Sequence, residues 1–292
     1  MKVIGIIAHN ENPRAAEMLI RLGACAASCG PQLLAWDETA AHLRRLGVPF
    51  KAGTPAQADA LLVLGGDGTM LRAVRDTVDS ARPLIGVNIG GLGFLTSVAQ
   101  SDLERAVDCL ARDAFTTSSR SMAVCSVIRD GLAVSNSVCL NDAVIRNGDS
   151  GRIVALEVSV DHGAAASIAA DGLIVATPTG STGHSLSAGG PILHPACPAF
   201  VVTFICAHAL GARPLVIPDS SVIEVGLVKS TDAIGLIVDG QGGLPLLSGD
   251  RVRISKAPNH VIFIHLPGYD YLSLLQQKLR WQGSTLAQSS AV

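Results

Sequence analysis

The spacing of apolar residues changes part-way along the chain, and this change most constrains the fold. Up to about residue 112, short apolar runs alternate with segments whose apolar residues recur at helical spacing. From about Thr116 onward, runs rich in Val and Ile follow one another, separated by Gly, Asp, Asn and Pro. The sequence therefore predicts an α/β domain with a parallel, Rossmann-like sheet, followed by a β-rich, sandwich-like domain. We place these domains at residues 1–112 and 113–267. We expect a C-terminal helix and tail, 268–292, to pack back on the first domain.

Both parts can be divided into expected elements. In the first, strands are predicted at Lys2–Ala8, Gln32–Trp36, Ala60–Leu64 and Leu84–Val87. Helices are predicted at Pro13–Cys29, from Asp37 as a cap to Leu46, from Thr69 to about Asp79, and from a Ser101–Glu104 capping box to Leu110. In the second, strands are predicted at Met122–Ile128, Val138–Arg146, Ile153–Val160, Gly172–Thr177, Val222–Val228, Ile234–Val238, Arg251–Ser255 and Val261–Leu266, before a helix at Tyr271–Trp281.

Charge and cysteine usage exclude several classes of protein. There are 22 Lys and Arg against 24 Asp and Glu, a net charge of −2, and the basic residues form no long run, so we expect no nucleic-acid partner. The seven cysteines include no Cys-x-x-Cys pair and lie mostly in apolar runs, which indicates reduced thiols and a cytoplasmic location. A stretch without charged residues, Gly172–Ala212, is broken by prolines and glycines, so we expect no membrane segment.

The motif with most chemical content follows the apolar run Leu61–Leu64. Here Gly65-Gly66-Asp67-Gly68-Thr69 separates a buried strand from a helix. Glycines let the backbone approach a phosphate closely, and the helix N-terminus adds amide donors. A carboxylate beside phosphates repels them, so Asp67 calls for a role as a general base or as a partner of magnesium. The simpler alternative is that Asp67 only caps the helix.

Other nucleotide signatures are absent from the sequence. There is no G-x-x-x-x-G-K-[ST] segment, which excludes a Walker-type enzyme. Gly90-Gly91-Leu92-Gly93 departs from the dinucleotide fingerprint, which disfavours a Rossmann dehydrogenase. Gly183-His184-Ser185-Leu186-Ser187 suggests a serine hydrolase with Asp171, but its spacing does not fit a nucleophile elbow.

Taken together, the motifs resemble those of the NAD kinase family. The resemblance runs in family order from about Leu61 to Trp281. It is carried by residues 65–69, 85–95, 140–145, 171–182, 213–217, 239–241 and 278–281. It implies an active site in the cleft between the two domains. It also implies transfer of the ATP γ-phosphoryl group, or one from polyphosphate in some members, to the 2′-hydroxyl of the adenosine ribose of NAD. A divalent cation such as Mg²⁺ and a homodimer or homotetramer are also implied.

The resemblance assigns roles to residues of this chain. Asp67 is the expected base, with Gly66, Gly68 and Thr69 around the phosphates. Arg72 could reach the same anion or lie on a solvated helix face. Asn141 and Asp142, expected on opposite faces of one strand, would bind NAD; a bulge or strand end is the alternative. The remaining expected nucleotide contacts are Arg152, Asp171, Thr179, Thr182, Gly183, His184, Ser185, Leu186, Ser187 and Gln241, and Arg152 could equally lie on the surface. No protein metal ligand is assigned.

The chain departs from the family at one place. Gly183-His184 stands where members usually carry Ala-Tyr, so an imidazole, which is a smaller ring, replaces a phenol. Two further functions stay open on the sequence. A lipid kinase of the diacylglycerol type shares the Gly65–Thr69 motif, although it usually continues with Asn-Glu, where this chain has Met70-Leu71. A non-catalytic NAD(P)-binding sensor would keep the same fold.

Overall fold

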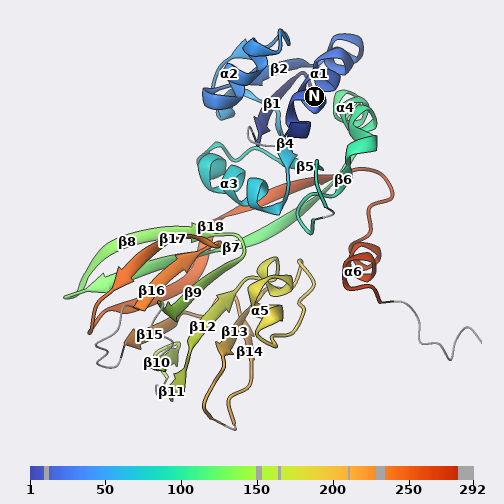
Figure 1. Ribbon diagram of the computed structural model, residues 1–292. Coiled ribbons are helices and arrows are strands. Elements are labelled where there is room, and N and C mark those ends of the chain that lie inside the picture. Colours follow the sequence, from blue (N-terminus) through green and yellow to red (C-terminus); the bar gives the residue numbers. More distant parts are fainter. Residues whose placement is uncertain are drawn as a thin grey trace, which may run out of the picture. The chain divides into compact units, whose positions relative to one another are not determined.

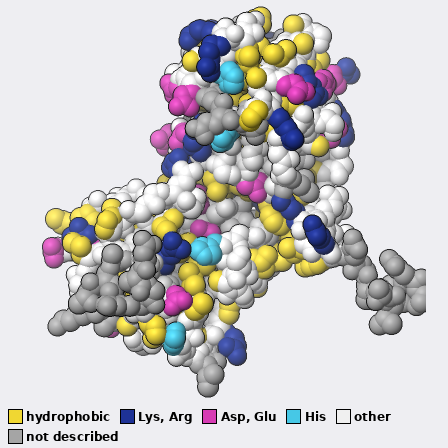
Figure 2. Space-filling model, viewed as in Figure 1, with side chains coloured by type: hydrophobic (Ala, Val, Ile, Leu, Met, Phe, Trp, Pro, Cys, Tyr) yellow, Lys and Arg dark blue, Asp and Glu magenta, His cyan; other side chains and the backbone are white. Residues whose placement is uncertain are grey.

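The computed structural model describes residues 1–9, 13–91, 93–148, 153–163, 166–209, 211–227 and 234–281 (Figure 1). The chain forms two compact units. Unit 1 comprises Met1–Ser118 and Ile262–Val292, and unit 2 comprises Ser119–Val261. Each unit has its own core. No helix within the described ranges is both long and apolar enough to cross a membrane. On the face drawn in Figure 2, basic and acidic side chains are interspersed, in keeping with the net charge of −2.

Unit 1 is built on a parallel sheet, as predicted. Its strands are β1 (Val3–Ala8), β2 (Gln32–Ala35), β3 (Lys51–Ala52), β4 (Ala60–Gly65), β5 (Leu84–Asn88) and β6 (Val98–Ala99). They lie in the order β5-β4-β1-β2-β3, with β6 and the end of β18 (Arg251–His265) paired to β5. The α-helices are α1 (Pro13–Cys29), α2 (Asp37–Arg45), α3 (Asp67–Thr77), α4 (Leu103–Ala111) and α6 (Tyr271–Leu279). Short 3₁₀ turns cover Pro55–Gln57, Val78–Ser80 and Gln100–Asp102.

The core of unit 1 follows from the apolar periodicity. Residues of α1, α2 and α4, among them Leu22, Leu43 and Leu110, pack with the sheet around Ile6 and Leu62, and all of these are buried. The step from β1 to β2 runs along the sheet in the opposite direction to the step from β4 to β5. Because such crossovers are right-handed, α1 and α3 lie on opposite faces. The expected bounds of the first helix, Pro13–Cys29, are confirmed.

Two predicted helix caps in unit 1 are wrong. Asp37 does not cap α2; it is the first helical residue, with φ 47°, and Trp36 precedes it without a side-chain cap. Ser101 and Glu104 form no capping box, because Asp102 precedes α4 and Gln100–Asp102 is a 3₁₀ turn. The Glu104 carboxylate instead pairs with Arg21 of α1, at 2.8 and 2.9 Å.

Unit 2 is a sandwich of two antiparallel sheets. One has the order β11-β10-β15-β18, with β7 and β8 continuing beyond β18, and the other has the order β14-β13-β12-β9-β16-β17. The strands are β7 (Thr116–Arg129), β8 (Leu132–Cys139), β9 (Asp142–Asn147), β10 (Val154–Val160), β11 (Ala166–Ala170), β12 (Gly172–Ala176), β13 (Ala199–Ile205), β14 (Leu215–Pro218), β15 (Ile223–Leu227), β16 (Ile234–Val238) and β17 (Gln241–Leu246).

Inner faces of both sheets contribute to one core. Val127 and Val252 from one sheet and Leu173, Phe200 and Leu236 from the other are all buried in it. The opposite face of the second sheet is buried too. There Val144, Ile174 and Val201 pack against Ala188 and Leu193, in the segment around the short helix α5 (His184–Ser187).

Three strand predictions in unit 2 are corrected by the structure. Val138–Arg146 is not one strand, because β8 ends at Cys139 and β9 begins at Asp142. Arg251–Ser255 and Val261–Leu266 are not separate, because β18 runs without a break from Arg251 to His265. Strands β11, β13, β14 and β17 are not anticipated by the sequence.

Candidate active site

The glycine loop of unit 1 joins β4 to α3. Gly65 ends β4, Gly66 precedes the helix in an extended conformation, and Asp67 is the first helical residue. A Cβ on Gly65 would overlap the buried side chain of Thr69, so the loop closes tightly only with glycine there. Gly68 is exposed. The first turn of α3 therefore directs backbone N–H groups toward solvent beside one carboxylate, an arrangement suited to binding an anion.

The carboxylate of Asp67 binds a second glycine-rich loop. Oδ2 accepts a hydrogen bond from the backbone N–H of Phe94 (2.8 Å), and Oδ1 accepts from those of Leu95 (2.9 Å) and Thr96 (3.3 Å). A Cβ on Gly93 would overlap Oδ1 of Asp67, so that position also requires glycine. The two glycine motifs, separate in sequence, thus form one structural unit around Asp67.

Asn88, the last residue of β5, organises the same loop from the other side. Its Nδ2 donates to the carbonyl oxygen of Gly91 (2.6 Å) and to Oγ1 of Thr96 (3.0 Å), while its Oδ1 accepts from the N–H of Gly90 (2.7 Å). Asn88 is buried. It holds the loop against the carboxyl ends of β4 and β5, the edge at which ligands bind in open parallel sheets.

In unit 2, Asp239 accounts for the break between β8 and β9. Its Oδ2 accepts from the N–H of Leu140 (2.9 Å), and its Oδ1 accepts from those of Asn141 (2.7 Å) and Asp142 (3.2 Å). Asp239 has φ 50° and Gly240 φ 69°, in the turn between β16 and β17. Three successive amides that point to one carboxylate cannot continue a strand ladder, so Asn141 lies in the break and is not on a sheet face as predicted.

Asp142, the first residue of β9, is buried next to this arrangement. Burial, and secondarily the charge of Asp239, raise the pKa of Asp142 to about 7. Oδ1 of the neighbouring Asn141 is buried without a hydrogen-bond partner among the described residues. A buried acceptor without a donor costs free energy. This pair therefore offers both an unused acceptor and a carboxyl group that changes charge near neutral pH.

A second segment of unit 2 lies directly against Asn141. A Cβ on Gly180 would overlap the backbone of Asn141, whose carbonyl oxygen accepts from the N–H of Thr177 at 2.9 Å. Ser181 and Ser185 are buried, and their hydroxyls bond within the unit, Ser181 to Leu193 and Ser185 to Thr203. The loop from Thr177 to Ser187 is therefore held in place by the fold itself.

Family models match most of each unit. The ATP-NAD kinase N-terminal domain matches residues 4–115, and the ATP-NAD kinase C-terminal domain matches residues 140–266. The chain belongs to the NAD kinase family. An NAD kinase from Desulforamulus reducens is 43% identical over 251 residues, covering 86% of this chain and 84% of the relative. One from Aromatoleum aromaticum is 37% identical and covers 97% and 95%, respectively. Both relatives are phosphotransferases by name, and neither supports a lipid kinase or a sensor.

Solved structures share the fold. A yeast NADH kinase complexed with NADH superposes with a TM-score of 0.85 at 23% identity, covering 97% of this chain and 89% of that one. An NAD kinase from Archaeoglobus fulgidus in complex with ATP gives a TM-score of 0.71 at 22% identity, covering 96% and 100%. These similarities confirm the two-domain NAD kinase fold, with a parallel α/β unit and an antiparallel β unit.

The other residues expected to contact substrates in this NAD kinase lie in several environments. Arg72 of α3 is half-buried, with Nε 4.0 Å from Oδ2 of Asp76, and it lines a pocket of about 240 Å³ with Trp36 and Thr39. Gln241 is half-buried directly after the Asp239-Gly240 turn. Arg152 lies outside the described residues.

Within the loop of unit 2, the expected contacts differ in accessibility. Gly183, His184 and Ser187 are exposed, while Thr182 and Leu186 are half-buried. Thr179 is buried, and its carbonyl oxygen accepts from Oγ1 of Thr182 at 3.2 Å. His184 is the first residue of the short helix α5 and is exposed, at the position where the family resemblance leads one to expect tyrosine.

Asp171 lies beside a residue that the sequence did not single out. The thiol of Cys206 donates to Asp171, and this hydrogen bond, with the charge of the carboxylate, raises the pKa of Cys206. Cys206 also has φ 46°, unusual for a residue with a side chain. It lines a pocket of about 590 Å³ together with His208 and Arg213. An apolar run ending in Ile205-Cys206 gave no signal for this; only the fold brings Asp171 next to it.

The donor groups of the site do not suit a metal ion held by the protein alone. Among the described residues, no three His, Cys, Asp or Glu side chains lie close enough to hold a metal ion. Asp67 and Asp239 each use most of their acceptor capacity on backbone amides. A protein-held metal centre does not fit these residues. Magnesium typically takes most of its ligands from phosphates and water, so any cation fits better as part of the phosphoryl donor.

Proposed function

We propose that this NAD kinase transfers the γ-phosphoryl group of ATP, with polyphosphate as a possible second donor, to the 2′-hydroxyl of the adenosine ribose of NAD, producing NADP. We assign the transfer chemistry to the glycine loops of unit 1 and the recognition of NAD to unit 2. The observation that carries this assignment is the half-buried carboxylate of Asp67 at the start of α3, between two loops that require glycine.

Asp67 has acceptor capacity left for a substrate hydroxyl. A carboxylate offers about four lone-pair sites, and three backbone amides use three of them. Among the described residues, Oδ2 accepts only from the N–H of Phe94, so it has one site for the ribose hydroxyl. The same amides fix the carboxylate in one orientation, which favours proton removal as the new phosphorus–oxygen bond forms. The helix N-terminus and the N–H groups of Gly66 and Gly68 would stabilise the phosphate charge, whereas the N–H of Thr69 already donates to the carbonyl oxygen of Gly66 (3.0 Å).

Unit 2 supplies the groups that suit a dinucleotide. The unused Oδ1 of Asn141 can accept from an amino group or hydroxyl, and Asp142 can accept when ionised or donate when protonated. We assign further nucleotide contacts to Asp171, Gln241 and the accessible face of the loop that contains Thr182, His184 and Ser187. His184 would offer a ring for stacking where the family usually has tyrosine.

We propose a cytoplasmic homodimer or homotetramer that uses ATP with Mg²⁺. All seven cysteines are free thiols, as in proteins of reducing compartments. Leu215 and Val216 are half exposed on β14, an edge strand of the second sheet in unit 2. Apolar side chains on a strand edge favour contact with another copy. When bound to the phosphates, the cation would offset the charge that develops during transfer.

The decisive experiment measures the turnover of the parent protein and of one variant. Purified protein with ATP, magnesium and NAD should form NADP, and Asp67→Asn should keep NAD binding while turnover falls by ~10²–10⁴-fold, the usual contribution of a general base. Asp79→Asn, at an exposed position in the 3₁₀ turn that follows the same helix, is the matched control and should turn over like the parent.

The amide side chain that Asp67→Asn introduces would also point N–H groups at the amides of Phe94 and Leu95, so loss of turnover needs a second readout. Hydrogen exchange of these amides separates the two effects. If they stay protected while turnover falls, the base assignment stands. If the variant retains parental turnover, Asp67 is not the base.

A further inference from the structure

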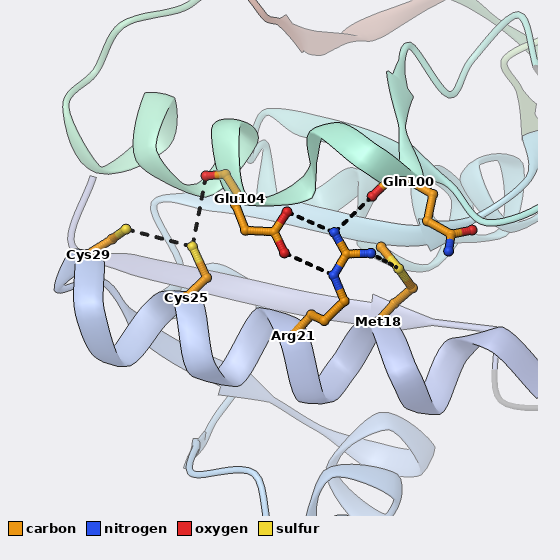
Figure 3. A network of polar contacts seen from close by, with 6 residues as sticks. All are labelled: Met18, Arg21, Cys25, Cys29, Gln100 and Glu104. Atoms are coloured by element: carbon orange, nitrogen blue, oxygen red, sulfur yellow. Dashed lines mark hydrogen bonds and ion pairs between the residues drawn. The ribbon is translucent and has the colours of Figure 1, made fainter.

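Two cysteines close the first helix, away from the glycine loops and independently of the proposed function. Cys25 is buried, Cys29 is half-buried at the last position of α1, and both are free thiols. Their sulfurs lie 3.7 Å apart, and Figure 3 shows them directed toward one another on the side of α1 that faces α4. Spaced four residues apart in a helix, the two side chains are neighbours on one face.

Helix α4 holds this geometry in place. The guanidinium of Arg21 forms two parallel bonds with the carboxylate of Glu104 and a third, at 3.3 Å, with the carbonyl oxygen of Gln100 (Figure 3). The thiol of Cys25 donates a hydrogen bond to the backbone carbonyl oxygen of Glu104, with 3.8 Å between sulfur and oxygen. Because Arg21 precedes Cys25 by one turn, the same contact that joins the helices also orients the buried thiol.

The distance between the two sulfurs favours a single atom bound to both of them over a disulfide bond. A disulfide requires about 2.05 Å between sulfurs and about 3.5–4.5 Å between Cβ atoms, whereas Cβ atoms four residues apart in a helix lie about 5–6 Å apart. Two sulfurs bound at about 2.3 Å to one central atom lie about 3.3–3.8 Å apart when the angle at that atom is between about 90° and 110°. The observed 3.7 Å matches the second arrangement without unwinding of the helix.

The chemistry of Cys25 leads to the same preference. Burial, followed by the contact with Cys29, raises the pKa of Cys25 to about 12. The thiolate is the species that attacks a disulfide or peroxide, so this thiol oxidises slowly at neutral pH. No group of three or more His, Cys, Asp or Glu in the described parts of the chain could complete a zinc site. The pair therefore suits a thiophilic centre that binds two thiols with release of their protons and brings its own third ligand.

We propose that Cys25 and Cys29 form a dithiol site for trivalent arsenic and related three-coordinate thiophilic species. With an aryl arsenoxide, two As–S bonds form and the arsenic–oxygen bonds break. The two thiol protons leave with the oxygen as one molecule of water. No electrons are transferred, so the step needs no oxidant. The product bridges the last turn of α1, and it leaves Arg21 and Glu104 in contact.

The test uses the reduced full-length chain and phenylarsine oxide, with intact-mass detection in excess monothiol. One equivalent should bind, resist the monothiol and be removed by 2,3-dimercaptopropanol. Cys25→Ser and Cys29→Ser should each weaken binding by about 100-fold or more, because one thiol loses the chelate advantage. Cys206→Ser, which removes an exposed thiol, and Cys109→Ser, which removes another thiol of the unit 1 core, are the matched controls and should bind as the parent does.

A second measurement keeps the proposal testable if Cys25→Ser folds poorly. Chelation should increase hydrogen-exchange protection of the Gly30 amide, which donates to the carbonyl oxygen of Ala26 at the end of α1. Cys25→Ala provides a less polar replacement in the buried position. Binding that survives in Cys29→Ser, or rapid closure of a Cys25–Cys29 disulfide by hydrogen peroxide with no tight arsenical complex, would overturn the proposal.

Discussion

Asp142 shows how one buried carboxyl group links stability to pH. Its folded-state pKa of about 7 lies above the ordinary value of 3.8, so the folded protein holds this proton more tightly than the unfolded chain. The stability this gives is fully present below pH 3.8 and is lost as the pH rises toward 7. Above pH 7 the native state carries the full cost of a buried charge beside Asp239.

Replacement of this carboxyl group should therefore increase the stability of the folded protein at high pH. Asp142→Asn should be more stable than the parent at pH 8 by roughly 1–3 kcal/mol, since each unit of pKa shift corresponds to about 1.4 kcal/mol before relaxation. This difference in the free energy of unfolding between Asp142→Asn and the parent should shrink at pH 5, where Asp142 is protonated in the folded parent. Thermal melts at the two pH values measure this, and a gap independent of pH would show that Asp142 stays ionised throughout.

Gly93 allows a similarly local test of the contact with Asp67. A Cβ at this position would overlap Oδ1 of Asp67, whereas one on Gly91 would meet nothing within 4 Å. Gly93→Ala should lower kcat at least tenfold and stability by about 1–3 kcal/mol through overpacking, while Gly91→Ala should leave both nearly unchanged. Steady-state kinetics and thermal melts of the two variants suffice. Equal effects would mean that the loop, and not the overlap with Asp67, is sensitive.

At the scale of elements, carboxylates that bind backbone amides decide where strands end. Asp239→Asn keeps a residue that tolerates the turn but replaces an acceptor with a donor toward the amides of residues 140–142. We expect a stability loss of about 1–3 kcal/mol and a raised KM for NAD, because Asn141 and Asp142 lose their positions.

Asp161 offers the matched control for this change. It also has φ 50° and accepts a single amide, that of Val222, at 2.8 Å, but it is exposed. Asp161→Asn should cost less than about 1 kcal/mol, as is usual for surface positions, and should leave the KM for NAD unchanged. If both variants alter KM alike, the effect does not come from the break between β8 and β9.

Individual helices and strands show which parts of the fold could be predicted from the sequence and which could not. Pro13–Cys29 was predicted correctly because its helical periodicity and the terminating Gly30, with φ 97°, are local signals. The break at Asn141 was only the alternative prediction, because its cause, Asp239, lies far along the chain. The expected gap between Arg251–Ser255 and Val261–Leu266 does not occur, because β18 pairs with β15 in its first part and with β5 at Phe263.

The candidate site likewise has some features that could be predicted from the sequence and others that could not. The glycine loop could be found from sequence because Gly65 and Asp67 are adjacent to a buried strand. The three amides bound by Asp67, the hydroxyl of Ser185 committed to Thr203 and the thiol of Cys206 beside Asp171 could not be. Each of these depends on residues that only the folded chain brings together.

At the scale of the whole molecule, unit 1 is assembled from two separate segments. Its sheet includes Phe263 of β18 paired with Leu84 of β5, and its core includes the buried Ile264 and Leu266. Nζ of Lys278 on α6 lies 5.2 Å from the ring of Phe94, in the loop held by Asp67. Unit 2 occupies the chain between these two segments.

Truncation tests this organisation. Removal of residues 262–292 should destabilise unit 1, since each large apolar side chain lost from a core is worth about 1.5–3 kcal/mol. Limited proteolysis should cut this truncated protein within residues 1–118 first. Stable unit 1 fragments without residues 262–281 would contradict this view.

The split of unit 1 sets an order of events during synthesis. A ribosome delivers the glycine loops early, yet Phe263 and Ile264 emerge only after another 143 residues (119 to 261), roughly 7–30 s later at ~5–20 residues per second. Unit 2 is continuous and can close during that interval. Until that segment is made, nascent unit 1 carries an unfinished sheet edge, so chaperone dependence should be concentrated there.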